Sequence, residues 1–265
     1  MVASAAQITI KSPREIELMR AANRVVYEVL QELGGLVRPG ATTSELDQRA
    51  DSIVKAAGGT ALFRGVENPQ AKFPFPACIC ASVNEQVVHG IPDDRPLAEG
   101  DIVSVDCGVR LRGYCGDAAR TFAVGQVAPR VQRLLDATRE ALELAEREIR
   151  PGRRWSQVAR QMQKVVERAG FGVVREFVGH GIGQQMHEEP KIPNYHDRNQ
   201  READFELQPG MTLAIEPMVT AGQPGVKLGD ETGWPVVTKD GSWAAHFENV
   251  IAVTADGAEI LSDGR

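Results

Sequence analysis

Apolar residues recur at helical spacing in four stretches of the chain. The first stretch follows Ser12-Pro13-Arg14-Glu15, which combines a capping-box serine and glutamate with proline at the first helical position. The second follows another capping-box sequence, Thr42-Thr43-Ser44-Glu45, and stops at Gly58 or Gly59. The same spacing predicts two further helices, over 131–149 and about 156–169.

Motifs from the first half of the chain return in the second half in the same order. Arg38-Pro39-Gly40 returns as Arg150-Pro151-Gly152, at an offset of 112 residues. At the same offset, Ala57-Gly58 matches Ala169-Gly170. Each stretch has the pattern of a helix, an Arg-Pro-Gly turn, a second helix and a glycine stop, so the sequence indicates an internal duplication.

The strands predicted after each helix pair also repeat. The segment from Leu97 to Asp106 lies over that from Leu207 to Glu216 at an offset of 110, and each is a glycine-led turn followed by an alternating apolar strand that ends on a carboxylate. We therefore predict two pseudo-symmetric α+β halves, about 1–126 and 127–265, that share one sheet.

This symmetry gives the two repeated carboxylates a common location. If a two-fold axis relates the halves, Asp106 and Glu216 occupy equivalent positions and can face each other across it. Each follows an apolar run and is expected to be partly buried, where a carboxylate needs a partner or a metal ion. The ordinary alternative is that both carboxylates face solvent at strand edges.

Composition and charge exclude several classes of protein. The net charge of −6 and the pI near 5.5 disfavour a nucleic-acid-binding protein, and no apolar stretch approaches the roughly 18 residues that a membrane helix needs. The N-terminus lacks the pattern of a signal peptide. The four cysteines match no common zinc pattern, so we expect reduced, buried thiols and a cytoplasmic protein.

Four further stretches carry side chains suited to chemistry. His89 ends an apolar run, Asp117 follows a glycine-rich turn, His180 and His187 lie in a glycine-dense segment, and Glu248 precedes a predicted strand. Taken singly, histidines such as these are more often structural. The glycines near His180 do not form a dinucleotide-binding fingerprint, and the sequence after His187 lacks the second histidine of H-E-x-x-H.

Taken together, these segments resemble the short, type I methionine aminopeptidases of bacteria, in peptidase family M24. The resemblance covers nearly the whole chain. It is carried by VNEQVVHGIPDDRPL (83–97), GDIVSVDCGV (100–109), GHGIG and HEEP within 179–190, GMTLAIEPMV (210–219) and GWPVVTKDGSWAAHFE (233–248). The family resemblance implies the pita-bread fold, with a curved antiparallel sheet and helices outside, as one catalytic domain over 1–265.

The resemblance also implies a role for each of these residues. The expected metal ligands are Asp106, Asp117, His180, Glu216 and Glu248, which would hold two divalent ions. This oxygen-rich set suits Mn²⁺, Fe²⁺, Co²⁺ or Zn²⁺. The expected catalytic residues are His89 and His187, which flank the substrate, and Glu216, which shuttles a proton.

The expected substrate pocket is an apolar slot for methionine. It would be lined by Phe75, Cys80, Met186 and Trp234, while His89 and His187 would contact the amide and carbonyl region of the substrate. Four residues depart from the family pattern: Met186 stands for a common phenylalanine, Phe75 for a tyrosine, and His246 and Asn249 for a glutamine and a histidine. Residues 66–74 look like extra length before the pocket, so these departures bear on its shape.

The implied activity is removal of the initiator methionine from nascent proteins whose second residue is small, by a metal-activated hydroxide that attacks the first peptide bond. We expect a monomer that works near the ribosome, with no membrane segment and no nucleic-acid site. Two alternatives remain open at this point: a proline-specific peptidase of the same fold, and a non-catalytic binding protein that keeps the fold.

Overall fold

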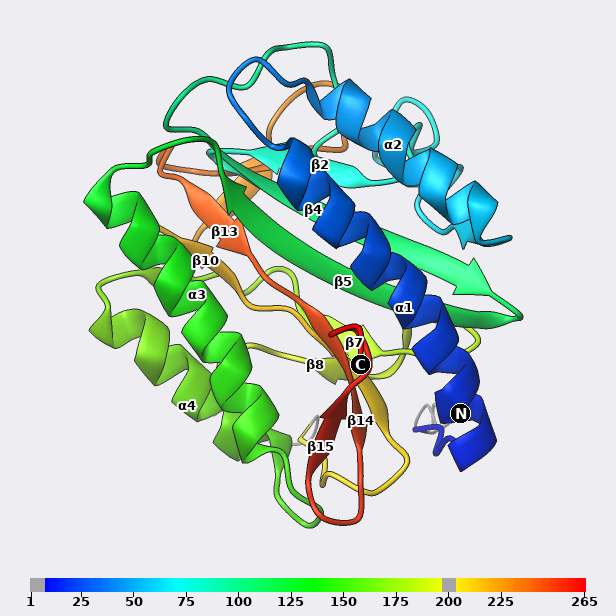
Figure 1. The fold of residues 1–265 in the computed structure, drawn as a ribbon. Helices are drawn as coiled ribbons and strands as arrows, with labels where there is room; N and C mark the ends of the chain where they lie inside the picture. The colour runs from blue at the N-terminus through cyan, green and yellow to red at the C-terminus, as the bar shows by residue number, and fades with distance from the viewer. Residues whose placement is uncertain (1–7, 197–203) are drawn as a thin grey trace.

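The structure is a computed structural model that describes residues 8–196 and 204–265 (Figure 1). Its helices are α1 (Pro13–Leu36), α2 (Thr43–Ala56), α3 (Pro129–Glu148) and α4 (Trp155–Arg168). Both predicted capping boxes are present, with Ser12 and Thr42 each accepting a hydrogen bond from the backbone of the glutamate three residues later. The four predicted helices are confirmed, and α3 begins two residues earlier than the apolar spacing indicated.

The strands are short except for two long central ones. In chain order they are β1 (Thr60–Ala61), β2 (Cys80–Val83), β3 (Gln86–Val88), β4 (Ile102–Leu111), β5 (Tyr114–Ala123), β6 (Gly172–Val173), β7 (Gly179–Gly181), β8 (Glu188–Ile192), β9 (Thr212–Ile215), β10 (Met218–Thr220), β11 (Val226–Leu228), β12 (Val236–Thr238), β13 (Ala244–His246), β14 (Asn249–Val253) and β15 (Ala258–Ile260).

The strand pairs recorded in the described parts of the chain are all antiparallel, and hydrogen bonding divides them into four groups. The orders are β1-β4-β2 with β5 on β4, β13-β10-β6, β11-β12-β3, and β15-β14-β9-β7-β8. The two long strands β4 and β5 belong to the first half of the chain, and β9, β10, β13 and β14 belong to the second. Both halves of the chain therefore contribute strands, and the group β11-β12-β3 combines strands from the two halves.

Backbone contacts in the first half of the chain have counterparts in the second half. An isolated bridge joins Thr42 to Pro96 in the first half, and another joins Arg154 to Glu206 in the second. Thr42 and Arg154 are 112 residues apart, and Pro96 and Glu206 are 110 apart, which are the offsets of the sequence motifs. Two hydrogen bonds repeat in the same way, from Gly40 N to Leu97 O at 2.8 Å and from Gly152 N to Leu207 O at 2.9 Å.

The repeated strands differ where they meet the carboxylates. Glu216 directly follows β9, as predicted, and Pro217 separates it from β10. Asp106, in contrast, lies in the middle of β4, so the prediction that this strand ends on its carboxylate was wrong. The reason is that β4 keeps pairing with β5 as far as Leu111, whereas Pro217 has no N–H to continue the ladder.

Helices cover the sheet from outside in both halves. Helix α1 lies across β4 and β5, with α2 beside it, while α3 and α4 pack together over the strands of the second half (Figure 1). A Cβ atom added at Gly116 would lie 2.5 Å from the backbone nitrogen of Asn23, so glycine lets α1 approach β5 closely. The amide oxygen of Asn23 accepts a hydrogen bond of 3.2 Å from the backbone N–H of Asp117.

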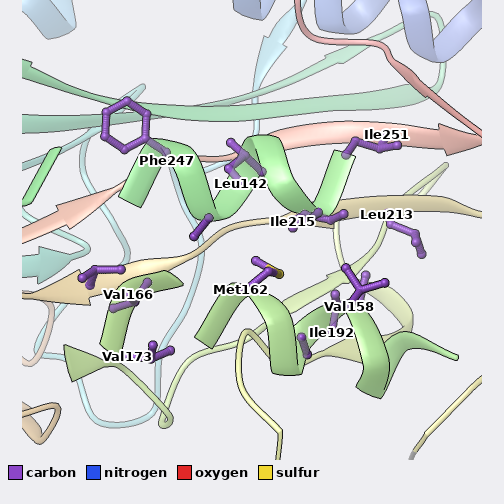
Figure 2. Packing of buried hydrophobic residues seen from close by; sticks show 14 of the residues in the cluster. Leu142, Val158, Met162, Val166, Val173, Ile192, Leu213, Ile215, Phe247 and Ile251 are labelled. Carbon is purple, nitrogen blue, oxygen red and sulfur yellow. The ribbon is translucent and has the colours of Figure 1, made fainter. Parts of the chain in front are cut away.

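The second half has a large apolar core between its helices and β9 (Figure 2). Leu142 of α3, Val158 and Met162 of α4 and Leu213 of β9 are almost fully buried in it. Each such side chain contributes roughly 1.5–3 kcal/mol of hydrophobic stabilisation. This packing fixes β9, the strand that delivers Glu216.

The two halves join along β5. The backbone N–H of Glu248 donates to Ala119 O at 2.9 Å, and the side chain of Thr121 bonds to the backbone of His246, accepting from N at 2.9 Å and donating to O at 2.8 Å. Residues flanking β14 are therefore held directly against the strand that carries Asp117.

The cysteines behave as the sequence indicated. All four lie within the described ranges and are buried and free: Cys78, Cys80, Cys107 and Cys115. Burial raises the pKa of the Cys78 thiol to about 12 and that of Cys115 to about 11, so these groups stay protonated near neutral pH. No helix among the described residues has the length and apolar character needed to cross a membrane.

Candidate active site

The junction between the halves contains a cavity of about 350 Å³. All eleven side chains predicted from the sequence line this cavity, namely Phe75, Cys80, His89, Asp106, Asp117, His180, Met186, His187, Glu216, Trp234 and Glu248. They come from segments more than 170 residues apart in the chain. The fold therefore brings the whole predicted set to one place.

Asp106 and Asp117 enter the cavity from the paired strands β4 and β5. Asp106 lies opposite Ala119 in this ladder, and Asp117 lies opposite Gly108. One carboxylate oxygen of each aspartate, Oδ1, is enclosed and finds no hydrogen-bond partner in the described parts of the chain. Buried carboxylate oxygens without a donor are unstable unless a cation or another donor compensates them.

Glycines on both sides place His180 on the narrow strand β7. A Cβ atom at Gly179 would lie 2.3 Å from Ala214 O, and one at Gly181 would lie 2.2 Å from Glu189 O, so only glycine permits the approach of β8 and β9. The Nδ1 atom of His180 lies 2.9 Å from Gly181 O. A carbonyl oxygen only accepts hydrogen bonds, so Nδ1 carries the proton and Nε2 keeps its lone pair.

That free nitrogen of His180 faces the carboxylates. Its Nε2 atom lies 3.8 Å from Asp117 Oδ2 and 3.6 Å from Glu216 Oε1. Ligand atoms of Asp117, His180 and Glu248 all lie within 4.8 Å of one another. Burial lowers the pKa of His180, which favours the neutral form that can coordinate a metal ion.

The backbone around Glu248 is held by a partly buried arginine. The guanidinium of Arg120 donates through Nη1 to the carbonyl oxygen of Glu248, and through Nη2 to Asn249 Oδ1 at 2.6 Å. Asn249 in turn donates to Glu146 Oε1 at 2.6 Å and accepts from Ser262 Oγ at 2.7 Å. This network fixes the turn that points the Glu248 carboxylate into the cavity.

Four carboxyl groups in one buried cavity cannot all be charged without compensation. Burial raises the pKa of Asp106 to about 7, with nearby His246 opposing the rise and Glu216 adding to it. Burial also raises the pKa of Glu216 to about 7. The pKa values of Asp117 and Glu248 are raised by burial and then by their neighbouring carboxylates. A divalent cation would supply the missing positive charge, so this donor set fits a metal site.

Two further histidines, His89 and His187, line the cavity. The ring of His89 makes edge contacts with Phe177 and Trp234, at centroid distances of 5.6 and 6.4 Å. Burial lowers its pKa to about 4, so it is neutral at physiological pH. The ring of His187 lies 4.3 Å from that of His180, and desolvation lowers its pKa as well.

Aromatic side chains form an apolar slot beside these groups. Phe75 packs edge-on against Trp234 at a centroid distance of 5.1 Å, and the indole N–H of Trp234 donates to Phe73 O at 2.8 Å. Cys80 and Met186 complete the predicted wall. The slot is therefore rigid on its aromatic side.

The cavity also contains residues that we did not predict as site residues. Phe63 and Phe177 line it, together with His246 and the start of the 66–74 segment. Phe177 directly precedes the glycine-rich stretch around His180, a proximity that could have indicated it. Phe63 lies in a turn that shows no motif, so only the tertiary structure places it 6.5 Å from Phe75.

This arrangement of carboxylates and histidine defines a metal-dependent hydrolase, and the sequence comparison assigns its family. The profile of metallopeptidase family M24 matches residues 17–255. The chain therefore belongs to metallopeptidase family M24.

Individual relatives narrow this assignment. The chain is 46% identical to methionine aminopeptidase 1 of Bacillus subtilis over 256 residues, which cover 96% of this chain and 99% of the relative. It is 42% identical to the methionine aminopeptidase of Escherichia coli K12 over 257 residues, which cover 96% of this chain and 94% of the relative. The crystal structure of methionine aminopeptidase from Thermotoga maritima superposes with a TM-score of 0.90 at 43% identity, covering 97% of this chain and 99% of that one.

Proposed function

We propose that this chain removes the N-terminal methionine from polypeptides whose second residue is small, by hydrolysing the first peptide bond. The observation that carries the proposal is the convergence of four carboxylates, one imidazole nitrogen and an apolar slot on a single cavity. The relatives matched over nearly their full length are methionine aminopeptidases, which supports methionine as the residue removed.

We infer that Asp106, Asp117, His180, Glu216 and Glu248 would hold two divalent ions. The enclosed oxygens of the two aspartates and the lone pair of His180 Nε2 support this assignment. The donor set suits Co²⁺, Mn²⁺, Fe²⁺ or Zn²⁺. When bound, such ions make a water molecule nucleophilic near neutral pH and polarise the substrate carbonyl group.

Side chains of the protein transfer the proton and stabilise the negative charge that develops during the reaction. Glu216, whose pKa is raised to about 7, accepts a proton from the attacking water and passes it to the leaving nitrogen. His187 donates a hydrogen bond to the oxygen that becomes negative, an interaction typically worth about 3 kcal/mol. Neutral His89 contacts the amide region of the substrate.

The apolar slot selects the side chain of the first residue. A methionine thioether fits a pocket formed by Phe75, Trp234, Cys80 and Met186, where contacts between sulfur and aromatic rings contribute roughly 0.3–1.5 kcal/mol. The edge-to-face packing of Phe75 on Trp234 sets the width of the slot. A charged first residue would lose its hydration in this slot without finding a partner.

A direct test compares metal content with peptide cleavage. The purified chain, after metal removal, is assayed on Met-Ala-Ser, Lys-Ala-Ser and an Xaa-Pro peptide, with and without added Co²⁺ or Mn²⁺. We expect release of methionine from Met-Ala-Ser alone, and only when metal is present. Cleavage restricted to the Xaa-Pro bond would instead indicate a proline-specific peptidase. A chain that binds no divalent ion would be a binding protein that keeps the fold.

We also propose that residues 1–265 act as one catalytic domain, as a monomer in the cytoplasm close to the ribosome, where nascent N-termini emerge. Proposed ligands from both halves support a single functional unit, and buried free thiols suit a reducing compartment. Light scattering after gel filtration should give a mass near 28.8 kDa. A dimer mass would contradict the monomer.

A further inference from the structure

A second buried histidine lies beside Glu216. His246 ends β13, is only 2% exposed, and lines the cavity. Its Nε2 atom has no hydrogen-bond partner among the residues that the structure describes, and lies 3.6 Å from Glu216 Oε2. A buried ring nitrogen without a partner is costly, so its position toward the site needs a functional explanation.

The duplication gives an independent reason to assign His246 to the site. Gly108 of β4 pairs with Asp117, and the equivalent residue 110 positions later, Met218 of β10, pairs with His246. His246 is therefore the counterpart in the second half of Asp117 in the first. The fold presents both positions to the same cavity.

Glu216 is thus placed between two imidazoles. His180 Nε2 lies 3.6 Å from Oε1 of its carboxylate, and His246 Nε2 lies 3.6 Å from Oε2. The backbone of His246 is fixed on both sides by the hydroxyl of Thr121. A closure of roughly 0.6 Å would bring the His246 N–H into hydrogen-bonding range, and catalytic hydrogen bonds commonly tighten in this way when substrate binds.

We propose that His246 is a positioning residue, whose neutral Nε2–H donates to Oε2 of Glu216 and fixes the rotation of that carboxylate. The inference rests on the proposed function, since Glu216 is there both a metal ligand and the proton carrier. With Oε2 held by His246, Oε1 stays directed toward His180 and the other carboxylates. Histidine ligands and carboxylate ligands are commonly oriented by such neighbouring donors.

Two substitutions distinguish hydrogen-bond donation by His246 from other roles of its imidazole ring. His246→Gln keeps an N–H donor of similar reach, whereas His246→Leu fills a similar volume without a donor. For each full-length protein, Co²⁺ affinity is measured by calorimetry, the visible absorption spectrum of the Co²⁺-loaded form is recorded, and kcat and KM are determined on Met-Ala-Ser.

For His246→Leu we expect kcat to fall by about 10-fold or more and Co²⁺ binding to weaken by about 10-fold, the usual effect of removing a donor to a metal ligand, with KM little changed. His246→Gln should stay within about 3-fold of the unmodified protein in all three quantities and keep its cobalt spectrum. If the leucine protein does not fold, His246→Asn replaces it, because its shorter side chain withdraws the donor.

Other outcomes would overturn the inference. A leucine protein equal to the unmodified one would show that Glu216 needs no donor. A glutamine protein that is equally impaired, or whose cobalt spectrum differs, would show that the imidazole ring itself is required, as a direct ligand. If the unmodified protein neither binds Co²⁺ nor releases methionine, the proposed function fails, which is a distinct result.

Discussion

Asp117 shows how burial determines the chemistry of a single side chain. It is only 2% exposed, its Oδ1 atom has no hydrogen-bond partner within the described ranges, and its pKa is raised by burial and by the neighbouring carboxylates. A folded protein tolerates such a group either protonated or next to a cation. The residue is therefore stabilised in its charged form only when the site is loaded.

Replacing Asp117 with asparagine should abolish this function while keeping the shape of the side chain. We expect Asp117→Asn to lower kcat on Met-Ala-Ser by more than about 10²-fold, the upper range for changes in residues that only support a ligand, and to reduce the amount of bound Co²⁺. Asp136→Asn, on the exposed face of α3, is the matched control. Near-normal turnover of the Asp117 variant would remove it from the metal site.

His187 should affect catalysis without affecting metal binding. It is not among the proposed ligands, and its ring lies 4.3 Å from that of His180. If it donates to the developing oxyanion, His187→Ala should lower kcat by about 10²-fold while bound Co²⁺, measured by atomic absorption, is unchanged. His196→Ala provides a control outside the cavity. An unchanged kcat would exclude His187 from the reaction.

At the scale of elements, the turn between β13 and β14 depends on a polar network behind the cavity. Asn249 accepts hydrogen bonds from Arg120 and Ser262 and donates one to Glu146. It stands where the resembling family commonly has histidine, so this chain supports Glu248 with an amide instead.

Removing the Asn249 amide should therefore destabilise the fold. Asn249→Ala leaves Nη2 of the partly buried Arg120 and the carboxylate of Glu146 without this partner, which typically lowers the free energy of unfolding by about 1–3 kcal/mol. Urea denaturation followed by circular dichroism measures this loss. Gln48→Ala, on the exposed face of α2, should stay within about 0.5 kcal/mol of the unmodified protein. An equally small effect at position 249 would show that the network is dispensable.

The helix starts, which depend on local sequence, could be predicted from the sequence. The end of strand β4 could not. The capping sequences at Ser12 and Thr42 place the starts of α1 and α2 correctly because the capping residues lie within four positions of each other. The continuation of β4 past Asp106 depends on pairing with β5, which an alternating apolar pattern does not reveal. The proline after Glu216 gave the local signal that β4 lacks.

The residues of the candidate active site also divide into those that local sequence indicates and those that only the tertiary structure places there. Asp106, Asp117, His180, Glu216 and Glu248 were identified from segments that resemble the family, and the structure places these side chains around one cavity. The lining by Phe63, Phe177 and His246 follows from the path of the chain in three dimensions. Only Phe177, next to the glycine-rich stretch around His180, had a local signal that could have indicated it.

For the whole molecule, the raised pKa values couple metal binding to pH. Asp106 and Glu216 titrate near pH 7 in the folded protein but near 4 when unfolded, so their contribution to stability is full below pH 4 and lost as the pH rises through 7. Cation binding needs the charged carboxylates and must displace these protons. As the pH rises above 7, the metal-free protein therefore loses stability, whereas metal binding becomes more favourable.

Calorimetric titration with Co²⁺ in buffers of different ionisation enthalpy measures this coupling. We expect tighter binding at pH 8 than at pH 6, and more protons released per ion at pH 6. Metal removal should accordingly lower the melting temperature more at pH 8. Equal proton release at both pH values would show that the carboxylates are already charged in the metal-free protein.

Both halves lie on one polypeptide, so equivalent positions are free to differ. Asp106 corresponds to Glu216, Asp117 to His246 and Arg120 to Asn249, by the strand register of the two halves. Two identical subunits around a two-fold axis would present every side chain twice. The two ends of the cleft between them would then be chemically identical. Because one chain carries both halves, its cleft can present different side chains to the amino end and to the carboxyl end of a peptide.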